Sequence, residues 1–475
     1  MQEIRHYDIA IIGSGPAGEK AAIQASKLKK RVFLIDKREK LGGASLHTGT
    51  IPSKSLRETV VNLELLRRRT HGIEISMREN VSTEELMYRK DLVISEQENK
   101  LRRNLMKNRV TLERGRCQFL SPTELQIQPA HPDEEPYQIT ANYTVVATGS
   151  APRKADWAQL DNECVFDSDT ILKIEKLPKK ITIIGAGVIG CEYACIFAKL
   201  GIRVNLIARD RHVMPFLDRE IAEALVYRMR NQRITMRLGE NVKQIVKISP
   251  QEVQVELESG KTLPCSTVML AAGRVANSDK LGLEEIGVEL GHNGLIQTNE
   301  HYQTNIPNIY AVGDVVGFPA LASTSLLQAR IATLHAFGQL ENERIPRELP
   351  YGIWTIPAVA YVGRSEEELT DARIPYEVGI AHFKEISRAH IMGEQEGILK
   401  LLFCPETLRL LGVHIIGPRA PELIHLGNCV LHFEGTIKFF INSVFNVPTL
   451  DEAYRIAAFN GMNRLDYDSL FGFAV

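Results

Sequence analysis

Two segments of this chain share one pattern, and that repetition constrains the fold more than any other feature. The first segment runs from Asp8 to Asp36 and reads DIAIIGSGPAGEKAAIQASKLKKRVFLID; the second runs from Lys180 to Ala208 and reads KITIIGAGVIGCEYACIFAKLGIRVNLIA. Each has an apolar β-branched run, a glycine-rich turn, an alanine-rich stretch and a second apolar run, which is typical of a strand–helix–strand unit. Two such units predict two dinucleotide-binding domains rather than a repeated solenoid.

The first glycine-rich turn, GSGPAG, has the residues that a dinucleotide pyrophosphate requires. Gly13 permits a tight turn, Gly15 lets the backbone approach the phosphates, and Gly18 allows close packing of helix on strand. The N-terminus of the following helix offers N–H groups and a positive dipole end. Asp36 ends the second strand, where a carboxylate can accept hydrogen bonds from a ribose. The alternative is a glycine-rich turn without a ligand.

The second turn, GAGVIG, repeats this arrangement with Gly185, Gly187 and Gly190 but lacks the acid. Ala208 occupies the position that matches Asp36, and Arg209 follows it. A carboxylate would repel a 2′-phosphate, whereas a guanidinium can pair with one. We therefore expect this site to accept NADP(H), with Arg211 assisting, and Ala208 places no bar against NAD(H). The alternative is that both arginines are solvated loop charges.

Composition narrows the class of protein. The 475 residues suggest about two to four domains. A formal net charge of -1 gives no reason to expect nucleic acid or an anionic membrane as a partner, and no apolar run is long enough for a bilayer-spanning helix. The N-terminus shows no signal peptide, and the seven cysteines show no CxxC spacing, so we expect a cytoplasmic protein. Cys191 and Cys195, one helical turn apart, are expected to pack in the core rather than to form a redox pair.

The remaining chain predicts further elements. We expect an amphipathic helix over 82–106, strands over 110–128 and 137–147, and a strand followed by a loop at 144–152 and again at 267–277. From Tyr351 onward the pattern changes. Strands are expected over 397–403 and 408–417 and helices near Pro421 and Thr449, which together indicate a third domain.

Six motifs occur in the order found in flavoprotein disulfide reductases, and the chain resembles that family over nearly its whole length. They are GSGPAG, GGASLHTGTIPSK (42–54), ATGS (147–150), GAGVIGCEYA (185–194), AAGR (271–274) and YAVGDV (310–315). The resemblance implies an α/β fold: two Rossmann-like domains, for FAD and NAD(P), and a C-terminal α+β interface domain in a homodimer. We expect the FAD domain at 1–150 and 277–348, the NAD(P) domain at 151–276 and the interface domain at 349–475.

The resemblance also implies site residues. Lys54 and Glu192 match a lysine and a glutamate that pair beside the flavin N5 and hold the ring for hydride transfer, although a structural ion pair is the alternative. Asp314 matches an aspartate that contacts the ribityl chain; a turn-forming role is its alternative. No metal is expected. The implied cofactor-binding set is Gly13, Gly15, Pro16, Ala17, Gly18, Asp36, Lys37, Gly42, Gly43, Ser45, Lys54, Thr148, Gly149, Gly313, Asp314, Ala322, Gly185, Gly187, Val188, Ile189, Gly190, Arg209, Gly273 and Arg274.

The departures from the family pattern decide the chemistry that we expect. Ser45 and Thr50 occupy the positions of the two redox cysteines, and neither hydroxyl can form a disulfide. Val447 stands where the family has the histidine that acts as acid–base partner of the thiols. Glu452 remains, with nothing evident to orient. Disulfide reduction is therefore not expected.

Within the family, the chain resembles the subgroup of soluble pyridine nucleotide transhydrogenases. The similarity lies in GTIPSK, GVIGCEYA, the segment from Phe445 to Leu465 and the segment from Tyr376 to Phe383. It implies ping-pong hydride transfer from NADPH to NAD+ at one nicotinamide site, in a homodimer or larger homo-oligomer. Three alternatives stay open: an NAD(P)H oxidoreductase that uses quinone, oxygen or a metal ion, a dihydrolipoamide dehydrogenase-like relative without the disulfide, and a catalytically idle binding protein.

Overall fold

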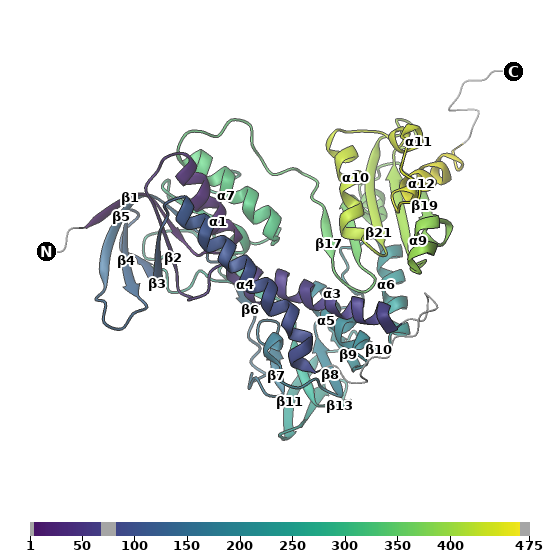
Figure 1. Ribbon diagram of the computed structural model, residues 1–475, viewed down its shortest axis with the longest axis horizontal. Coiled ribbons are helices and arrows are strands. Elements are labelled where there is room, and N and C mark those ends of the chain that lie inside the picture. The colour runs from purple at the N-terminus through teal and green to yellow at the C-terminus, as the bar shows by residue number, and fades with distance from the viewer. Residues whose placement is uncertain (1–3, 68–81, 466–475) are drawn as a thin grey trace. The chain divides into compact units, whose positions relative to one another are not determined.

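A computed structural model describes residues 4–67 and 82–465 of the chain. Within those residues the chain divides into two compact units. Of the described residues, the first unit draws on 4–59, 82–176 and 272–345, and the second on 60–67, 177–271 and 346–465. Each unit therefore combines segments that lie far apart in the sequence (Figure 1).

The first unit is built on a six-stranded, mostly parallel sheet in which β1 pairs in parallel with both β2 and β5. The apolar end of β1 and most of β2 are buried, as parallel strands covered on both faces require. β4 pairs antiparallel with β3 and β5. The strands are β1 (Arg5–Ile12), β2 (Val32–Asp36), β3 (Thr111–Phe119), β4 (Glu124–Pro129), β5 (Tyr137–Val146) and β16 (Ile309–Ala311), with a separate antiparallel pair, β6 (Ser150–Pro152) and β15 (Arg274–Ala276).

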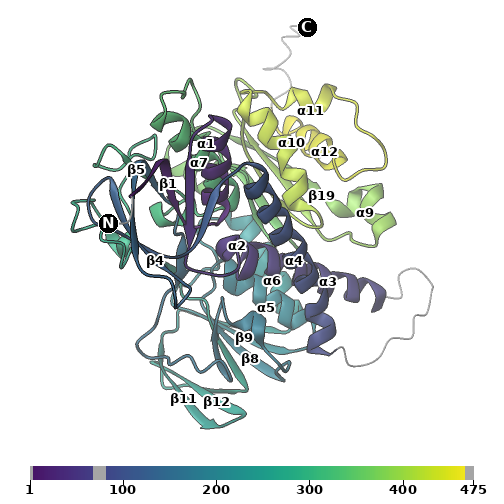
Figure 2. The same cartoon turned by 60° about the vertical axis from the view of Figure 1, so that its left-hand side comes forward.

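Small residues bring the helices of the first unit close to this sheet. α1 (Pro16–Lys27) and α7 (Ala322–Ala336) lie side by side in both views and share one core in which most helical residues are alanine (Figures 1 and 2). α2 (Gly43–His47) and α3 (Thr50–Arg67) follow the loop after β2. α4 (Thr83–Lys107) begins at a capping box, in which Ser82 and Glu85 each accept a hydrogen bond from the other's backbone N–H group.

The second unit contains the second strand–helix–strand segment. Its parallel strands follow the order β10 (Ile234–Leu238), β9 (Arg203–Ala208), β8 (Lys180–Ile184) and β14 (Thr267–Leu270). α5 (Val188–Lys199) joins β8 to β9, and α6 (Arg219–Asn231) joins β9 to β10. An antiparallel sheet of β11 (Val242–Ser249), β12 (Glu252–Leu257) and β13 (Thr262–Cys265) follows. The short strand β7 (Val165–Asp167) precedes this segment in the chain.

The C-terminal part of the second unit is an antiparallel sheet with helices on it. The strand order is β17 (Tyr351–Ile353), β18 (Val359–Gly363), β21 (Leu410–Ile416), β20 (Ile398–Phe403) and β19 (Glu377–His382). The Tyr454 hydroxyl ties two helices together: it accepts a hydrogen bond from the Gly427 N–H (3.1 Å) and donates one to the Leu423 carbonyl (2.8 Å). The helices are α8 (Glu366–Asp371) and four that are labelled in Figure 2, α9 (Ser387–Met392), α10 (Ala420–His432), α11 (Lys438–Asn442) and α12 (Glu452–Met462).

The predicted α/β class is confirmed, and most expected elements form where the pattern placed them. The helix expected over 82–106 is α4, while the run 110–128 is two strands, β3 and β4, because a turn at 120–123 interrupts it. The bounds of the four domain segments stay predictions. All seven cysteines are free thiols; Cys191 and Cys195 are buried in α5, and burial raises the pKa of Cys191. In the described part of the chain, no helix is long and apolar enough to cross a membrane.

Candidate functional site

The first glycine-rich turn has the backbone contacts that its sequence predicts. Gly13 has a φ of +110°, and a Cβ atom on it would lie 2.3 Å from the Ala147 carbonyl oxygen. A Cβ on Gly18 would lie 1.8 Å from the Gly13 carbonyl oxygen, so α1 can approach β1 only with glycine there. A Cβ on Gly43, at φ +61°, would lie only 2.9 Å from the Gly15 Cα. The turn before α1 and the loop before α2 thus meet backbone to backbone.

Asp36 lies at the end of β2 and holds this turn. Its Oδ2 accepts hydrogen bonds from the backbone N–H of Ser14 (2.8 Å) and from the Ser14 hydroxyl (2.6 Å). Its Oδ1 accepts one from the Arg38 N–H at 2.9 Å. Because a carboxylate has about four lone-pair positions, Asp36 keeps capacity for a further donor such as a ribose hydroxyl. Lys37 beside it is exposed.

A hollow of about 170 Å³ opens next to the turn. Three residues predicted for cofactor binding line it, namely Pro16, Gly42 and Ser45. The helix α4 contributes Gln97, Lys100 and Asn104 to the same hollow, and none of these was singled out from the sequence. Their periodicity indicated an amphipathic helix but not which face of that helix meets a ligand.

Two buried hydroxyls of the first unit also fit a site for FAD. Thr148 Oγ1 and Thr48 Oγ1 are both buried and have no hydrogen-bond partner. Buried hydroxyls are nearly always satisfied in folded proteins, so two orphaned hydroxyls beside the predicted site suit a ligand rich in hydroxyls and phosphates. Gly149 follows Thr148 at φ +69°, with open space where a Cβ would lie.

Asp314 and Arg274 are linked through Ser150. Asp314 lies in a short 3-10 helix (Gly313–Val316) and accepts a hydrogen bond from the Ser150 hydroxyl at 2.7 Å. Arg274 donates to the hydroxyl and the carbonyl of Ser150, both at 2.8 Å, and pairs with Asp169 at 3.1 Å. Three of the guanidinium donors are therefore used within the protein, which favours a structural role for Arg274. Gly273, at φ +102°, has open space beside it.

Residues of the C-terminal half of the first unit also reach the start of α1. A Cβ on Gly313, at φ +81°, would lie 3.4 Å from the Ala17 side chain. The Gly313 N–H donates to Gln328 Oε1 at 2.7 Å, which fixes it to α7, and Ala322 is the first residue of that helix. The structure therefore brings Gly13, Ala17 and Gly313 together although 300 positions separate the last from the first.

The second glycine-rich turn reproduces the first. Gly185 has a φ of +114°, and a Cβ on Gly190 would lie 1.8 Å from the Gly185 carbonyl oxygen. A Cβ on Gly187 would meet no heavy atom within 4 Å, so the N-terminus of α5, which starts with Val188 and Ile189, is open to a ligand. β9 ends at buried Ala208, and Arg209 and Arg211 are exposed. The carboxylate is thus absent from the strand end, as the sequence predicts.

Glu192 is buried in α5 and receives a hydrogen bond that the sequence could not reveal. Its Oε1 accepts the backbone N–H of Trp354 at 2.9 Å, so the segment after β17 fixes the carboxylate. Lys54 is half-buried on α3 and belongs to the first unit, whereas Glu192 belongs to the second. The predicted pairing of Lys54 with Glu192 therefore stays a prediction.

The positions that depart from the disulfide reductase pattern are accessible. Ser45 is half-buried in α2, Thr50 is exposed at the start of α3, and Val447 is 64% exposed. Glu452, for which the sequence offered no partner, lies 3.7 Å from Arg455 in the first turn of α12. None of the four side chains is a thiol or an imidazole.

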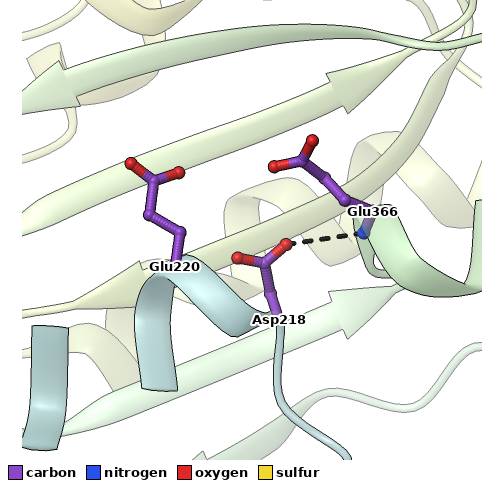
Figure 3. A group of neighbouring side chains, drawn as sticks. All are labelled: Asp218, Glu220 and Glu366. Carbon is purple, nitrogen blue, oxygen red and sulfur yellow. Dashed lines mark hydrogen bonds between the residues drawn. The ribbon is translucent and has the colours of Figure 1, made fainter. Parts of the chain in front are cut away.

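Three carboxylates of the second unit lie close enough together to hold a cation: Asp218, Glu220 and Glu366 (Figure 3). Figure 3 also shows the Glu366 N–H donating to Asp218 (3.4 Å). The Lys400 ammonium already lies among them, 2.9 Å from Asp218 and 3.0 Å from Glu220 and in contact with Glu366. An ammonium therefore supplies the charge that a metal ion would bring, and we assign no metal here.

Comparison with known proteins places this geometry in a family. Residues 7–332 match the family model described as pyridine nucleotide-disulphide oxidoreductase, and residues 349–458 match the dimerisation domain of that family. The chain is 42% identical to a soluble pyridine nucleotide transhydrogenase of Mycobacterium bovis (97% of this chain, 98% of that one). It is 40% identical to the one from Pseudomonas putida (97% and 99%).

Solved structures agree with the sequence matches. LpdA from Mycobacterium tuberculosis superposes with a TM-score of 0.87 at 25% identity, covering 96% of this chain and 99% of that one. The HOCl-induced flavoprotein disulfide reductase RclA from Escherichia coli gives the same TM-score, identity and coverage. With both glycine turns in place and family matches over most of its length, the chain belongs to the pyridine nucleotide-disulphide oxidoreductase family.

Proposed function

We propose that this protein is an FAD-dependent transhydrogenase that transfers hydride from NADPH to NAD+, giving NADP+ and NADH. One observation carries the proposal: both dinucleotide turns are present, whereas Ser45, Thr50 and Val447 replace the relay that would pass electrons to a disulfide. A flavin reduced in such a protein has nicotinamides as its available partners. The names of the relatives from Mycobacterium and Pseudomonas support the same activity.

The first unit would hold FAD. The turn from Gly13 to Gly18 and the start of α1 would present N–H groups to the pyrophosphate, and Asp36 would accept a hydrogen bond from a ribose hydroxyl. The orphaned hydroxyls of Thr48 and Thr148 and the carboxylate of Asp314 remain for the polar chain. When bound, FAD supplies the isoalloxazine ring that accepts hydride from one nicotinamide and returns it to another.

The second unit would bind both nicotinamide dinucleotides in turn. Gly187 leaves room for a pyrophosphate at the start of α5. Ala208 withholds the carboxylate that would repel a 2′-phosphate, and Arg209 offers a charge that attracts one. NAD+ lacks that phosphate and meets no obstacle at Ala208. One site therefore serves both substrates, and successive binding gives ping-pong kinetics.

Lys54 and Glu192 complete the site in this proposal. The Trp354 N–H fixes the Glu192 carboxylate. In this proposal Lys54 would balance the charge of that carboxylate beside the ring. Only hydride moves between the nicotinamides, so no side chain has to give or take a proton. The absence of an imidazole at Val447 is consistent with that chemistry.

We also propose a homodimer formed through residues 349–458, in the cytoplasm. The segment matches a dimerisation domain, and its surface carries exposed apolar side chains that a partner subunit would cover, including Phe433 (80% exposed), Phe439 and Val444 (97% exposed). The four segments 1–150, 151–276, 277–348 and 349–475 serve as the FAD, NAD(P), FAD and interface parts of each subunit.

Anaerobic stopped flow on the FAD-loaded protein tests this function. NADPH should bleach the flavin absorbance, and NAD+ added afterwards should restore it. Turnover with quinone or oxygen is measured in parallel. A reduced enzyme that passes electrons to quinone or oxygen faster than to NAD+ would contradict the transhydrogenase proposal and favour a different acceptor.

A further inference from the structure

We infer that Arg237, on β10, binds the 2′-phosphate of NADP(H) together with Arg209. This inference rests on the proposed function, because it concerns the second dinucleotide site. The sequence did not single out Arg237, which lies 29 positions beyond Ala208 on a different strand of the sheet. Four observations lead to it: strand register, loop hydrogen bonds, an unsatisfied side-chain donor and the local charge.

The strand register places Arg237 at the edge of the site. β10 pairs in parallel with β9, so that Arg237 lies beside Ile207 and Leu238 lies beside Ala208. Ligands of open α/β sheets bind beyond the carboxyl ends of the strands. Arg237 is therefore the penultimate residue of the strand next to the one that carries the predicted 2′-phosphate determinant.

Backbone hydrogen bonds join the ends of these two strands. The Gly239 N–H donates to the Asp210 carbonyl (3.1 Å), and the Glu240 N–H donates to the Ala208 carbonyl (3.0 Å). Arg211 also reaches this strand end, since its Cγ lies 3.5 Å from where a Cβ on Gly239 would be. The loop that begins at Arg209 and the end of β10 thus form one connected wall.

The Arg237 guanidinium has a donor that the protein leaves unsatisfied, although its charge also acts on the Glu240 carboxylate. Its Nε atom is buried and makes no hydrogen bond. Among residues 4–67 and 82–465, no carboxylate forms an ion pair with Arg209, Arg211 or Arg237, whereas Arg228 of the same unit pairs with Glu396 at 2.5 Å. A half-buried guanidinium with an orphaned donor suits an anionic ligand.

The local charge leaves an excess for such a ligand. Arg209, Arg211 and Arg237 carry three positive charges near two acids, Asp210 and Glu240. Glu240 is already paired within the protein, because Lys261 lies 2.6 Å from it. Lys261, Ser259 and, to a smaller extent, Arg237 lower the pKa of its carboxyl. A phosphate monoester brings about 1.5 to 2 negative charges and three acceptor oxygens at neutral pH.

Arginine and phosphate match in geometry as well as in charge. A guanidinium offers five donors in a planar fork that can bind phosphate oxygens in a bidentate manner. Arg209 is exposed in a loop, whereas Arg237 is held on a strand and is partly buried. We therefore expect Arg237 to contribute to the discrimination between NADP(H) and NAD(H), because less side-chain freedom is lost when it binds.

The test uses FAD-loaded protein and two probes, 2′,5′-ADP and 5′-AMP, titrated by calorimetry. Only the first probe carries the 2′-phosphate. Arg237→Met should weaken 2′,5′-ADP binding at least about tenfold and change 5′-AMP binding less than about twofold. Arg230→Met, which removes an exposed arginine from α6 in the same unit, is the matched control and should change neither.

The outcomes separate this inference from the proposed function. If Arg209→Ala weakens 2′,5′-ADP binding while Arg237→Met does not, the inference about Arg237 is wrong and the NADP(H) site stands. If the unaltered protein binds both probes equally, the NADP(H) part of the proposed function itself fails. If Arg237→Met lowers the melting temperature, Arg237→Lys, which keeps the charge, is measured instead. Retained 2′,5′-ADP binding supports a role of the charge, and loss of 2′,5′-ADP binding with intact 5′-AMP binding supports bidentate contact. Loss of binding to both probes overturns the inference.

Discussion

Lys400 offers a direct test of what holds the second unit together. Its side chain is fully buried on β20, and its ammonium contacts Asp218, Glu220 and Glu366. Asp218 caps the N-terminus of α6 through the Ile221 N–H, whereas Lys400 and Glu366 belong to the C-terminal sheet region. Lys400→Met keeps most of the side-chain volume and leaves the three carboxylates without a cation.

The magnitude follows from the burial of each acid. Removing one partner of a buried ion pair costs about 3–5 kcal/mol, because the remaining charge is left in a medium of low polarity. Only Asp218 is fully buried; the side chains of Glu220 and Glu366 are 44% and 31% exposed, so water screens both. We therefore expect a loss of about 3 kcal/mol, which corresponds to roughly 6–12 °C at about 2–4 °C per kcal/mol.

Thermal unfolding at fixed protein and FAD concentration measures this loss. Lys261→Met is the matched control, since Lys261 pairs with Glu240 at 2.6 Å but is 57% exposed, and its loss should cost less than about 1 kcal/mol. Adding Asp218→Asn to Lys400→Met should recover part of the stability, because the buried charge is then gone. A Lys400→Met protein that melts within about 1 °C of the unaltered protein would refute the reasoning.

Three further changes probe the first unit and the missing relay. Ser45→Cys combined with Thr50→Cys should not create dihydrolipoamide oxidation, because Val447 still provides no acid–base group. A rate of dihydrolipoamide oxidation close to the rate of transhydrogenation would contradict this. Thr148→Val should weaken FAD binding about fivefold, the equivalent of one hydrogen bond of ~1 kcal/mol, while the apoprotein keeps its melting temperature, as a fluorescence titration and thermal unfolding can check. Burial and the stacked ring of His301 lower the pKa of His335, whose Nδ1 shares a hydrogen bond with the Tyr310 hydroxyl. Because the folded protein favours neutral His335, the contribution of this residue to stability is complete above about pH 6.5 and is lost as the pH falls. His335→Asn should therefore reduce the drop in melting temperature between pH 7 and pH 5, and an unchanged drop would exclude His335 as its source.

The sequence predicts the parts of the site that depend on local geometry. At Gly18 and Gly190, a Cβ would lie 1.8 Å from a carbonyl oxygen, so the turn itself demands glycine and its residue type reveals the turn. Asp36 and Ala208 follow at fixed positions on the next strand, because each strand–helix–strand unit fixes its own register. The preference of the second dinucleotide site could therefore be predicted from two residues at the end of its second strand, Ala208 and Arg209.

The sequence does not predict contacts that tertiary packing creates. Lys400 contacts Asp218, which lies 182 positions earlier in the chain. No local pattern indicates that a lysine in an apolar strand neutralises the carboxylate that caps α6. Trp354 contributes a backbone N–H to Glu192, and the identity of its side chain carries no sign of that role. Arg237 and the α4 residues beside the hollow were missed for the same reason. Periodicity predicts which face of an element is buried but not which other element or ligand contacts that face.

Glu192 is where structure and chemistry can be separated most cleanly. Its carboxylate accepts the Trp354 N–H, and this contact alone could explain a buried glutamate in α5. Glu192→Gln keeps an oxygen acceptor for that N–H but removes the charge that we place beside the flavin. If the charge matters, the variant should melt within a few degrees of the unaltered protein, yet NADPH should bleach its flavin at least about tenfold more slowly, a barrier change of about 1.4 kcal/mol.

Glu192→Ala is the companion variant, because it removes the acceptor as well and should also lower the melting temperature by leaving the Trp354 N–H without its partner. Stopped flow and thermal unfolding on both variants therefore measure two roles of one side chain independently. A Glu192→Gln protein that reduces its flavin at the full rate would show that the charge of Glu192 is not needed for hydride transfer. The role in hydride transfer would then rest on Lys54 and the two dinucleotide turns.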